Sequence, residues 1–151
     1  MRRQRPKMAV DDLPEPAWFE QISRDCLCEL PELAREAIAK FNTGEYYEQH
    51  DLLETLWRST EAPVRQLYQA ILQIGIAYYQ VEQGNWRGAV KMLDRGLRWM
   101  RYLPDACQGV DVNQLRSNAE TLRSELKRVR EAGMRTVDRS MFRPVPLMGK
   151  D

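Results

Sequence analysis

One histidine and one glutamate, His50 and Glu54, are the residues best spaced to do chemistry in this sequence. They stand four positions apart in the segment QHDLLETLW, so on a helix their side chains can touch. A carboxylate beside an imidazole raises the affinity of the imidazole for its proton. In a cleft, the pair could therefore act as a general base with its orienting group, or as two metal ligands.

The same two residues also fit a structural role. Gln69 and Gln73 stand on the next predicted helix, and buried amides need hydrogen-bond partners. Consecutive helices joined by a short loop are usually antiparallel neighbours, so a network could run from His50 through Glu54 to one of these glutamines. Such a network would fix how the two helices pack. We favour the structural interpretation, because structural networks perturb titratable groups as active sites do.

Metal binding is the weaker of the catalytic alternatives. The chain contains a single histidine, so Glu48, Asp51 or Asp94 would have to complete the ligand set. The sequence also contains no phosphate-binding loop, no dinucleotide-binding glycine pattern and no nucleophile-elbow motif. We therefore expect no metal site and no cofactor.

Aromatic side chains near this pair are candidates for binding. They could line a pocket for a small apolar or ring-shaped ligand, although aromatic residues at helical spacing beside leucines are more typical of a core. Together with the two glutamines, the candidate binding residues are Tyr46, Tyr47, Trp57, Gln69 and Gln73.

The elements that would position these residues are helices. Apolar residues recur at helical spacing, and glycine, proline or capping residues stand between the periodic segments. We predict an all-α fold: one domain over residues 14–133, a flexible tail over 1–13 and an extended C-terminal tail over 134–151. The expected helices are 16–26, 31–44, 45–60, 63–83, 86–103 and 111–133.

A repeat of about forty residues runs through the middle of the chain. Gly44, Tyr46 and Leu53 return as Gly84, Trp86 and Leu93, so a turn, an aromatic residue and a second helix occur twice. This layout is close to a tetratricopeptide hairpin, but two copies are too few for a solenoid. We expect a compact bundle of about six helices built on two helical hairpins.

Composition restricts the possible partners. The net charge is only +1, and the arginine-rich stripe over residues 87–101 is more typical of a solvated face than of a nucleic-acid site. The longest run without charged residues, 66–81, is too short and too polar to span a membrane. Apolar residues at heptad spacing over 115–129 could form a homodimer seam or dock on the chain's own bundle, and the sequence favours neither.

The three cysteines give an odd number and no zinc-binding pattern. Cys26 and Cys28 are two positions apart, so on a helix they point in nearly opposite directions. No secretory signal is visible near Met1. We therefore expect reduced thiols and a cytoplasmic protein.

The segment from Phe41 to about Leu97 resembles domain of unknown function family 309, a family of small all-helical proteins. The family pattern F-N-x-G-x-Y-x-x-x-H-x-x-x-E-x-x-W is matched here by Phe41, Asn42, Gly44, Tyr46, His50, Glu54 and Trp57. A glutamine-bearing helix follows, and then Gly84, Asn85, Gly88 and Ala89. Relatives often carry a second histidine where this chain has Gln80, which weakens a two-histidine metal site. The resemblance implies a helical fold and no established activity.

Two functional hypotheses follow from these observations. The first is a non-enzymatic binding or scaffold module that presents a groove or a basic face to a protein partner. The second is a small hydrolase-like or metal-dependent enzyme in which His50 and Glu54 act as acid and base or as ligands, supported by Tyr46, Gln69 and Gln73. The second hypothesis requires a cavity at His50 that solvent can reach.

Overall fold

The computed structural model describes residues 13–149, which form six α-helices, one short β-hairpin and two 3-10 helices. The predicted all-α bundle is confirmed. The expected flexible tail lies, apart from Leu13, outside the described residues. The elements are α1 (Pro16–Asp25), α2 (Glu32–Asn42), α3 (Gln49–Ser59), α4 (Arg65–Glu82), α5 (Trp86–Trp99), β1 (Ala106–Cys107), β2 (Val110–Asp111), α6 (Val112–Gly133, kinked at Arg130), η1 (Met134–Thr136) and η2 (Arg139–Met141).

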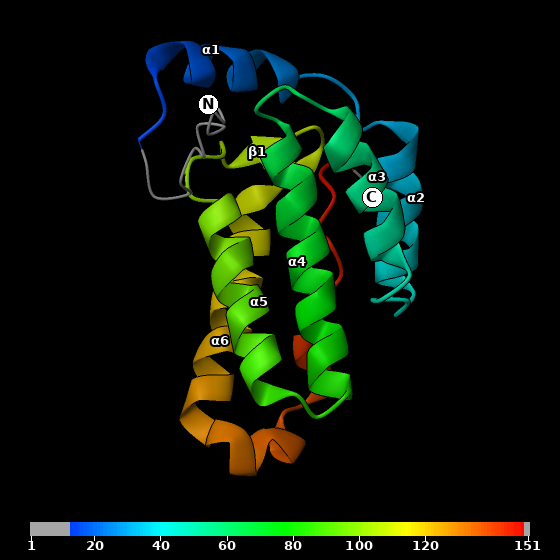
Figure 1. The fold of residues 1–151 in the computed structure, drawn as a ribbon, viewed down its shortest axis with the longest axis vertical. Helices are drawn as coiled ribbons and strands as arrows, with labels where there is room; N and C mark the ends of the chain where they lie inside the picture. Colours follow the sequence, from blue (N-terminus) through cyan, green and yellow to red (C-terminus); the bar gives the residue numbers. More distant parts are fainter. Residues whose placement is uncertain (1–12, 150–151) are drawn as a thin grey trace, which may run out of the picture.

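The centre of the fold is α4. It runs along the middle of the molecule, with α5 and then α6 on one side and α3 and then α2 on the other, while α1 crosses one end (Figure 1). Apart from one charged residue at each end and four glutamines, α4 is apolar, and a helix that is hydrophobic nearly all round is stable only when its neighbours cover it. No helix among the described residues is long and apolar enough to cross a membrane.

Two helical hairpins, α2–α3 and α4–α5, form the repeated unit. Gly44 and Gly84 end the first helix of each hairpin with φ angles of 89° and 75°, a conformation that glycine adopts at little cost. After Gly84 the next helix begins almost at once, because the Asn85 side chain accepts a hydrogen bond from the backbone of Gly88.

The first hairpin differs from the second at its turn. The expected helix start at Glu45 is one turn too early: residues 46–48 form turns, and α3 begins at Gln49. The ring of Tyr46 packs edge-on against Phe41, Tyr78 and Phe142. We attribute the late start to this packing, which involves a residue almost a hundred positions away.

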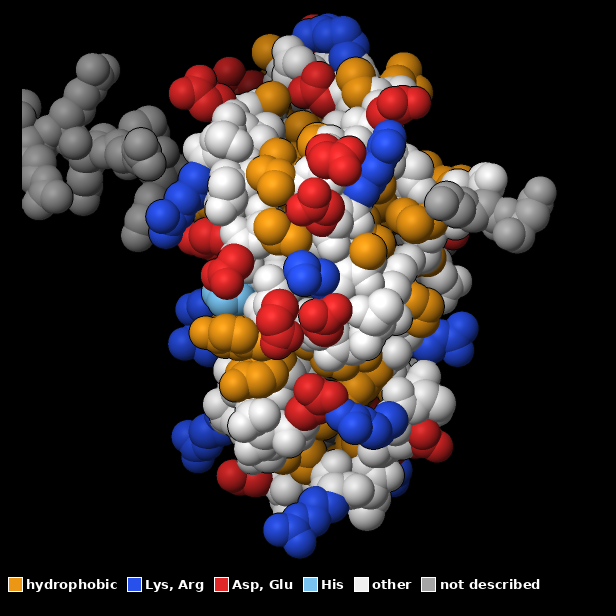
Figure 2. Space-filling view, turned by 90° about the vertical axis from the view of Figure 1, so that its right-hand side faces the viewer, with side chains coloured by type: hydrophobic (Ala, Val, Ile, Leu, Met, Phe, Trp, Pro, Cys, Tyr) orange, Lys and Arg blue, Asp and Glu red, His pale blue; other side chains and the backbone are white. Residues whose placement is uncertain are grey.

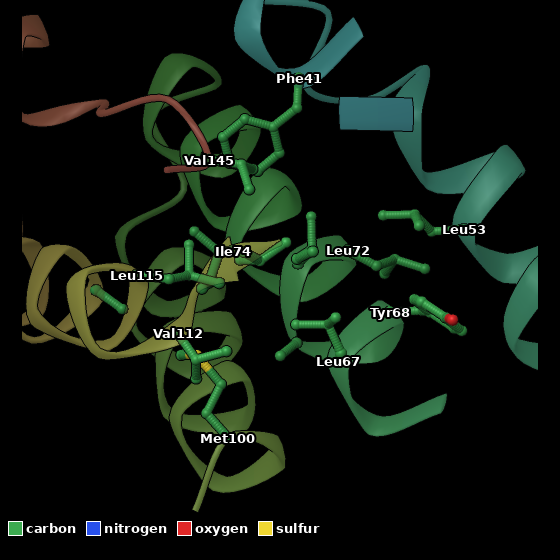
Figure 3. Packing of buried hydrophobic residues seen from close by; sticks show 14 of the residues in the cluster. Phe41, Leu53, Leu67, Tyr68, Leu72, Ile74, Met100, Val112, Leu115 and Val145 are labelled. Atoms are coloured by element: carbon green, nitrogen blue, oxygen red, sulfur yellow. The ribbon is translucent and has the colours of Figure 1, made fainter. Parts of the chain in front are cut away.

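One core joins the helices. In Figure 3, Ile74 of α4 lies beside Leu115 of α6, and Met100, just after α5, lies beside Val112. Val145 lies beside Phe41. The heptad residues Leu115, Ala119, Leu122 and Leu126 are each at most 1% exposed, and α6 packs on α5. The apolar stripe of α6 is therefore used inside the chain's own bundle.

The segment after α6 is built into the fold. It turns through η1 and η2 and runs back along the bundle, where Leu147 pairs with Val110 of β2 (Figure 1). Val145 is 2% exposed, and its backbone N–H donates to the side chain of Asn42. Residues 134–149 are thus held by core packing and hydrogen bonds to distant parts of the chain.

The prediction of three reduced thiols is wrong for two of them. Cys26, just after α1, and Cys107 in β1 form a disulfide although 81 positions separate them. Cys28 remains free and exposed. The β-hairpin also bonds to the end of α1, because Gln108 donates through its backbone N–H to the carbonyl of Cys26. The reduced-thiol argument for a cytoplasmic protein therefore no longer stands.

Candidate ligand-binding groove

The imidazole of His50 is engaged near the molecular surface. Its Nδ1 lies 2.5 Å from the carbonyl oxygen of Tyr47, and its Nε2 lies 3.3 Å from a carboxylate oxygen of Asp51. The side chain is 26% exposed, and the histidine is visible in the space-filling view (Figure 2). Its partners are all within three positions in the sequence, so His50 organises the start of α3 and does not link α3 to α4.

Glu54 has a different partner. Its Oε1 accepts from the guanidinium of Arg58, one turn further along α3, at 3.2 Å from Nε and 3.0 Å from Nη2. Within residues 13–149, no hydrogen bond or ion pair joins Glu54 to His50, Gln69 or Gln73. The predicted network from His50 to the glutamines of α4 is therefore wrong, and the acid–base pair required by the enzymatic hypothesis is not assembled.

A neighbouring residue, Gln49, links α3 to α4 instead. It is fully buried, and its Nε2 donates to the carbonyl oxygens of Tyr46 at 2.9 Å and Leu72 at 3.2 Å. Space for this amide exists because Gly75 has no side chain: a Cβ there would lie 2.3 Å from Nε2 of Gln49. The spacing of Gln49, Leu53 and Leu56 on one helical face could have indicated its burial.

A groove between α3, α4 and α5 collects several of the predicted residues. It has a volume of about 410 Å³ and is lined by Glu54, Trp57, Gln69, Gln73, Arg95, Arg98 and Trp99. Small-molecule sites in proteins typically measure roughly 300 to 1,000 Å³. Three of the five predicted binding residues and one of the two predicted catalytic residues thus meet at one place, which we call the α3–α5 groove.

Close packing of α5 on α4 forms the floor of the α3–α5 groove. A Cβ at Gly96 would lie 3.1 Å from Ile74 and 3.6 Å from the Cβ of Gln73, so this glycine lets the helices approach closely. Arg95 and Trp99 flank Gly96 on α5 and so fall beside the glutamines of α4. Periodicity within α5 does not show that Gly96 lies against α4, so the sequence alone could not predict this close contact.

Several polar groups of the groove have no protein partner. Gln73 donates through Nε2 to Oε1 of Gln69 at 2.8 Å, but its own Oε1 is buried without a hydrogen bond. The indole Nε1 of Trp57 is buried and unpaired as well. Unpaired buried polar atoms are uncommon in folded proteins, and each costs stability. Two of them in one groove mark a place where a ligand could complete the bonding.

Charge in the groove is positive. Glu54 is neutralised by Arg58, whereas no ion pair holds Arg95 or Arg98 within the described part of the chain. Asp94, the one acid within the arginine stripe, bonds to Arg123 of α6 and therefore does not compensate them. Arg95, Arg98 and Trp99 were not predicted as site residues, because an arginine stripe alone does not show which of its members face a groove.

Tyr46 and Tyr47 lie elsewhere. Tyr46 belongs to the aromatic cluster with Tyr78, and burial raises the pKa of both phenols above the ordinary value. Tyr47 is 48% exposed and packs against His50 and Tyr79 on the surface. Neither tyrosine lines the α3–α5 groove.

Metal binding finds no support in the geometry. No group of three or more histidine, cysteine, aspartate or glutamate side chains in residues 13–149 is arranged to hold a metal ion. The donors gathered in the α3–α5 groove are amides, guanidinium groups and an indole, with Glu54 already paired.

Comparison with known proteins agrees with the sequence pattern. Residues 34–92 match the family described as domain of unknown function DUF309. An uncharacterized protein of Aquifex aeolicus (strain VF5) is 27% identical over 90 residues, which cover 59% of this chain. The match spans about a quarter, 27%, of that protein's length. The segment that resembles the DUF309 family contains α3, α4 and part of α5, and hence most of the residues that line the groove.

Proposed function

We propose that this protein is a non-enzymatic binding module and that the α3–α5 groove is its binding site. The observation that carries the proposal is the pair of unpaired buried atoms, Nε1 of Trp57 and Oε1 of Gln73, in the lining of one groove. A ligand that bonds to them removes a cost that the free protein bears, and this gain adds to the binding free energy.

The size of the groove suits a small molecule. Its 410 Å³ lie within the range of small-molecule sites and are too small for a folded partner. A protein partner, as expected from the sequence, would fill the groove with a single side chain. We do not propose the enzymatic alternative, because His50 bonds to Tyr47 and Asp51, away from the groove that contains Glu54.

A fragment screen tests this proposal. We would screen a chemically mixed fragment library by ligand-observed NMR against the parent protein and the double variant Gln69→Met/Gln73→Met. Methionine has a similar shape but cannot form these hydrogen bonds. Hits should bind the parent and lose affinity for the double variant. The matched control is Gln83→Met, which changes an exposed glutamine just beyond α4 and should retain all hits.

The result that contradicts the proposal is equally specific. If hits bind the double variant as tightly as the parent, or if no fragment binds the parent, the groove is not a binding site. Thermal melting of each variant checks that loss of binding does not come from unfolding.

A further inference from the structure

The unused groups of the α3–α5 groove are mostly hydrogen-bond donors. Nε1 of Trp57 can only donate, and the two guanidinium groups of Arg95 and Arg98 also only donate. Gln69 is 93% buried (7% exposed), and its Nε2 has no hydrogen-bond partner within residues 13–149, since its Oε1 receives the bond from Gln73. Residues from three helices that carry these donors thus line one groove.

The single carboxylate of the lining, that of Glu54, uses Oε1 for its bond to Arg58. Among the described residues, one buried acceptor of the lining has no partner. It is Oε1 of Gln73, held in place because the Nε2 of the same amide is bonded to Gln69. A ligand that matches the groove therefore needs acceptor atoms with negative charge and one O–H or N–H of its own. Hydrogen bonds from arginine to an oxyanion are stronger than neutral ones, and two arginines can share the two or three oxygens of such a group.

A neutral or cationic ligand fits these groups less well. A cation would lie beside two uncompensated arginines, since Glu54 bonds to Arg58 and Asp94 to Arg123. A third guanidinium, that of Arg65, lies over the Trp57 ring at 3.9 Å from its centroid, and its Nε is also buried without a partner. This guanidinium adds to the positive potential around the Trp57 indole.

We infer that the ligand of the α3–α5 groove is a small organic anion that carries a carboxylate or phosphate group together with a hydroxyl or N–H donor. The inference rests on the proposed binding function and specifies its ligand class. The oxyanion bonds to the arginines and to the N–H groups of Trp57 and Gln69, and the ligand's donor bonds to Oε1 of Gln73.

The tryptophan indole groups give a direct readout in ¹H–¹⁵N correlation spectra. Trp57 and Trp99 line the groove, whereas the indole N–H of Trp86 donates to the carbonyl oxygen of Leu126 at 2.8 Å and serves as an internal control. The probes are four matched compounds: mandelate, phenylacetate without the hydroxyl, mandelamide without the charge, and phenyl phosphate. Mandelate should shift the Trp57 and Trp99 signals and leave the Trp86 signal unchanged.

Affinity should follow charge first and the hydroxyl second. Mandelamide should bind at least about tenfold more weakly than mandelate, the effect of losing one charge-assisted hydrogen bond, and phenylacetate should be intermediate. Arg95→Gln and Arg98→Gln should each weaken mandelate binding about tenfold. Arg87→Gln, at an exposed position of the same helix outside the groove lining, should change it less than about twofold. Phenyl phosphate against phenylacetate, which both lack the hydroxyl, decides whether phosphate or carboxylate is preferred.

Failure of this inference differs from failure of the proposed function. If mandelamide binds as tightly as mandelate, or the arginine variants bind mandelate like the parent, the ligand is not an anion although the groove still binds ligands. The anion is likewise excluded if fragments from the screen occupy the groove and none of the three anionic probes does. If neither the fragments nor the probes shift the Trp57 signal, both proposals fall.

Discussion

Two glutamine sites lie at the α4 helix, and they differ in what surrounds them. Gln49 is fully buried between α3 and α4, whereas Gln69 and Gln73 face the α3–α5 groove. Each site leaves one amide oxygen unpaired, Oε1 of Gln49 and Oε1 of Gln73. In a sealed core such an atom is only a stability cost, because nothing can reach it. Oε1 of Gln73 is equally buried in the free protein, but it belongs to a residue that lines a groove, so a small side-chain movement would bring it to a ligand.

The pairing of the amide N–H groups shows the same difference. Gln49 donates to two backbone carbonyls, those of Tyr46 and Leu72, and so links two helices. Gln73 donates only to Gln69, on its own helix. A glutamine that donates to the backbone of another helix holds the two helices together. A glutamine that donates only to a side chain of its own helix does not hold helices together.

Gly75→Ala should destabilise the sealed site most. The new Cβ would lie 2.3 Å from Nε2 of Gln49 and 3.1 Å from the ring of Phe41, so the amide must leave its position. We expect a loss of about 2–3 kcal/mol in the free energy of unfolding, measured by urea denaturation. Adding Gln49→Ala should restore part of the loss. A single variant as stable as the parent would show that Gln49 is not packed as described.

Tyr68→Phe tests a third glutamine, which is paired on both sides. The phenol donates to Oε1 of Gln108 at 2.8 Å, and Nε2 of Gln108 donates to the carbonyl oxygen of Asp25. Removing the hydroxyl leaves Oε1 buried and unpaired, so we expect a loss of about 1–3 kcal/mol in the free energy of unfolding at pH 7. Tyr79→Phe is the control and should be nearly neutral, because Tyr79 contributes a ring contact with Tyr47 that phenylalanine retains.

The same tyrosine predicts a pH dependence at high pH. Burial raises the pKa of Tyr68 to about 12, against 10.0 for a free tyrosine. The unfolded chain therefore releases this proton first, so the stabilisation is complete below pH 10 and is lost between pH 10 and 12. Unfolding free energies measured across this range should fall less steeply for Tyr68→Phe than for the parent. Equal slopes would contradict the raised pKa.

Matched methionine substitutions compare the two sites directly. Gln49→Met breaks one hydrogen bond to α4, at Leu72, and one to the turn before α3, at Tyr46, and should lower the free energy of unfolding by about 1–2 kcal/mol. Gln73→Met breaks one bond within a helix and removes an unpaired oxygen, so the change should be below about 0.5 kcal/mol in either direction. Urea denaturation of both variants measures the contrast. Equal losses at the two positions would remove the distinction between a sealed and an open amide.

The smallest effects should occur at the pair that first suggested chemistry. Arg58, the partner of Glu54, has a side chain that is 73% exposed, and such surface pairs contribute little. Glu54→Gln should therefore change the free energy of unfolding by less than about 0.5 kcal/mol, as chemical denaturation can show. A loss well above about 1 kcal/mol would mean that Glu54 holds the core after all.

The sequence was sufficient for the helices and their pairing because these follow from local periodicity and turn residues. Gly44 and Gly84 end their helices as expected, and α4 is buried as its apolar pattern predicts. Trp57, Gln69 and Gln73, three of the five residues grouped as binding candidates, line one groove, since helices joined by a short loop lie side by side. These inferences needed no knowledge of distant contacts.

The errors concern contacts that periodicity does not encode. The sequence pattern placed His50 on the buried face of α3, but the buried polar residue there is its neighbour Gln49. Gly75 of α4 has no side chain and leaves room for the Gln49 amide. Arg95 and Arg98 could not be chosen from the arginine stripe without the close approach at Gly96. The pairing of Cys26 with Cys107 depends on how α1 folds over the β-hairpin, and no local pattern reports that.

The disulfide has a consequence for proteolysis. It closes a covalent ring that contains both helical hairpins, from the end of α1 to β1. A protease cut at any one bond inside this ring, for example in the α4–α5 turn at Gly84, yields two pieces that stay covalently joined. On a non-reducing gel the nicked protein would migrate as one species, and only a reductant would separate the pieces. The groove can therefore lose the continuity of its backbone while its three helices remain parts of one molecule.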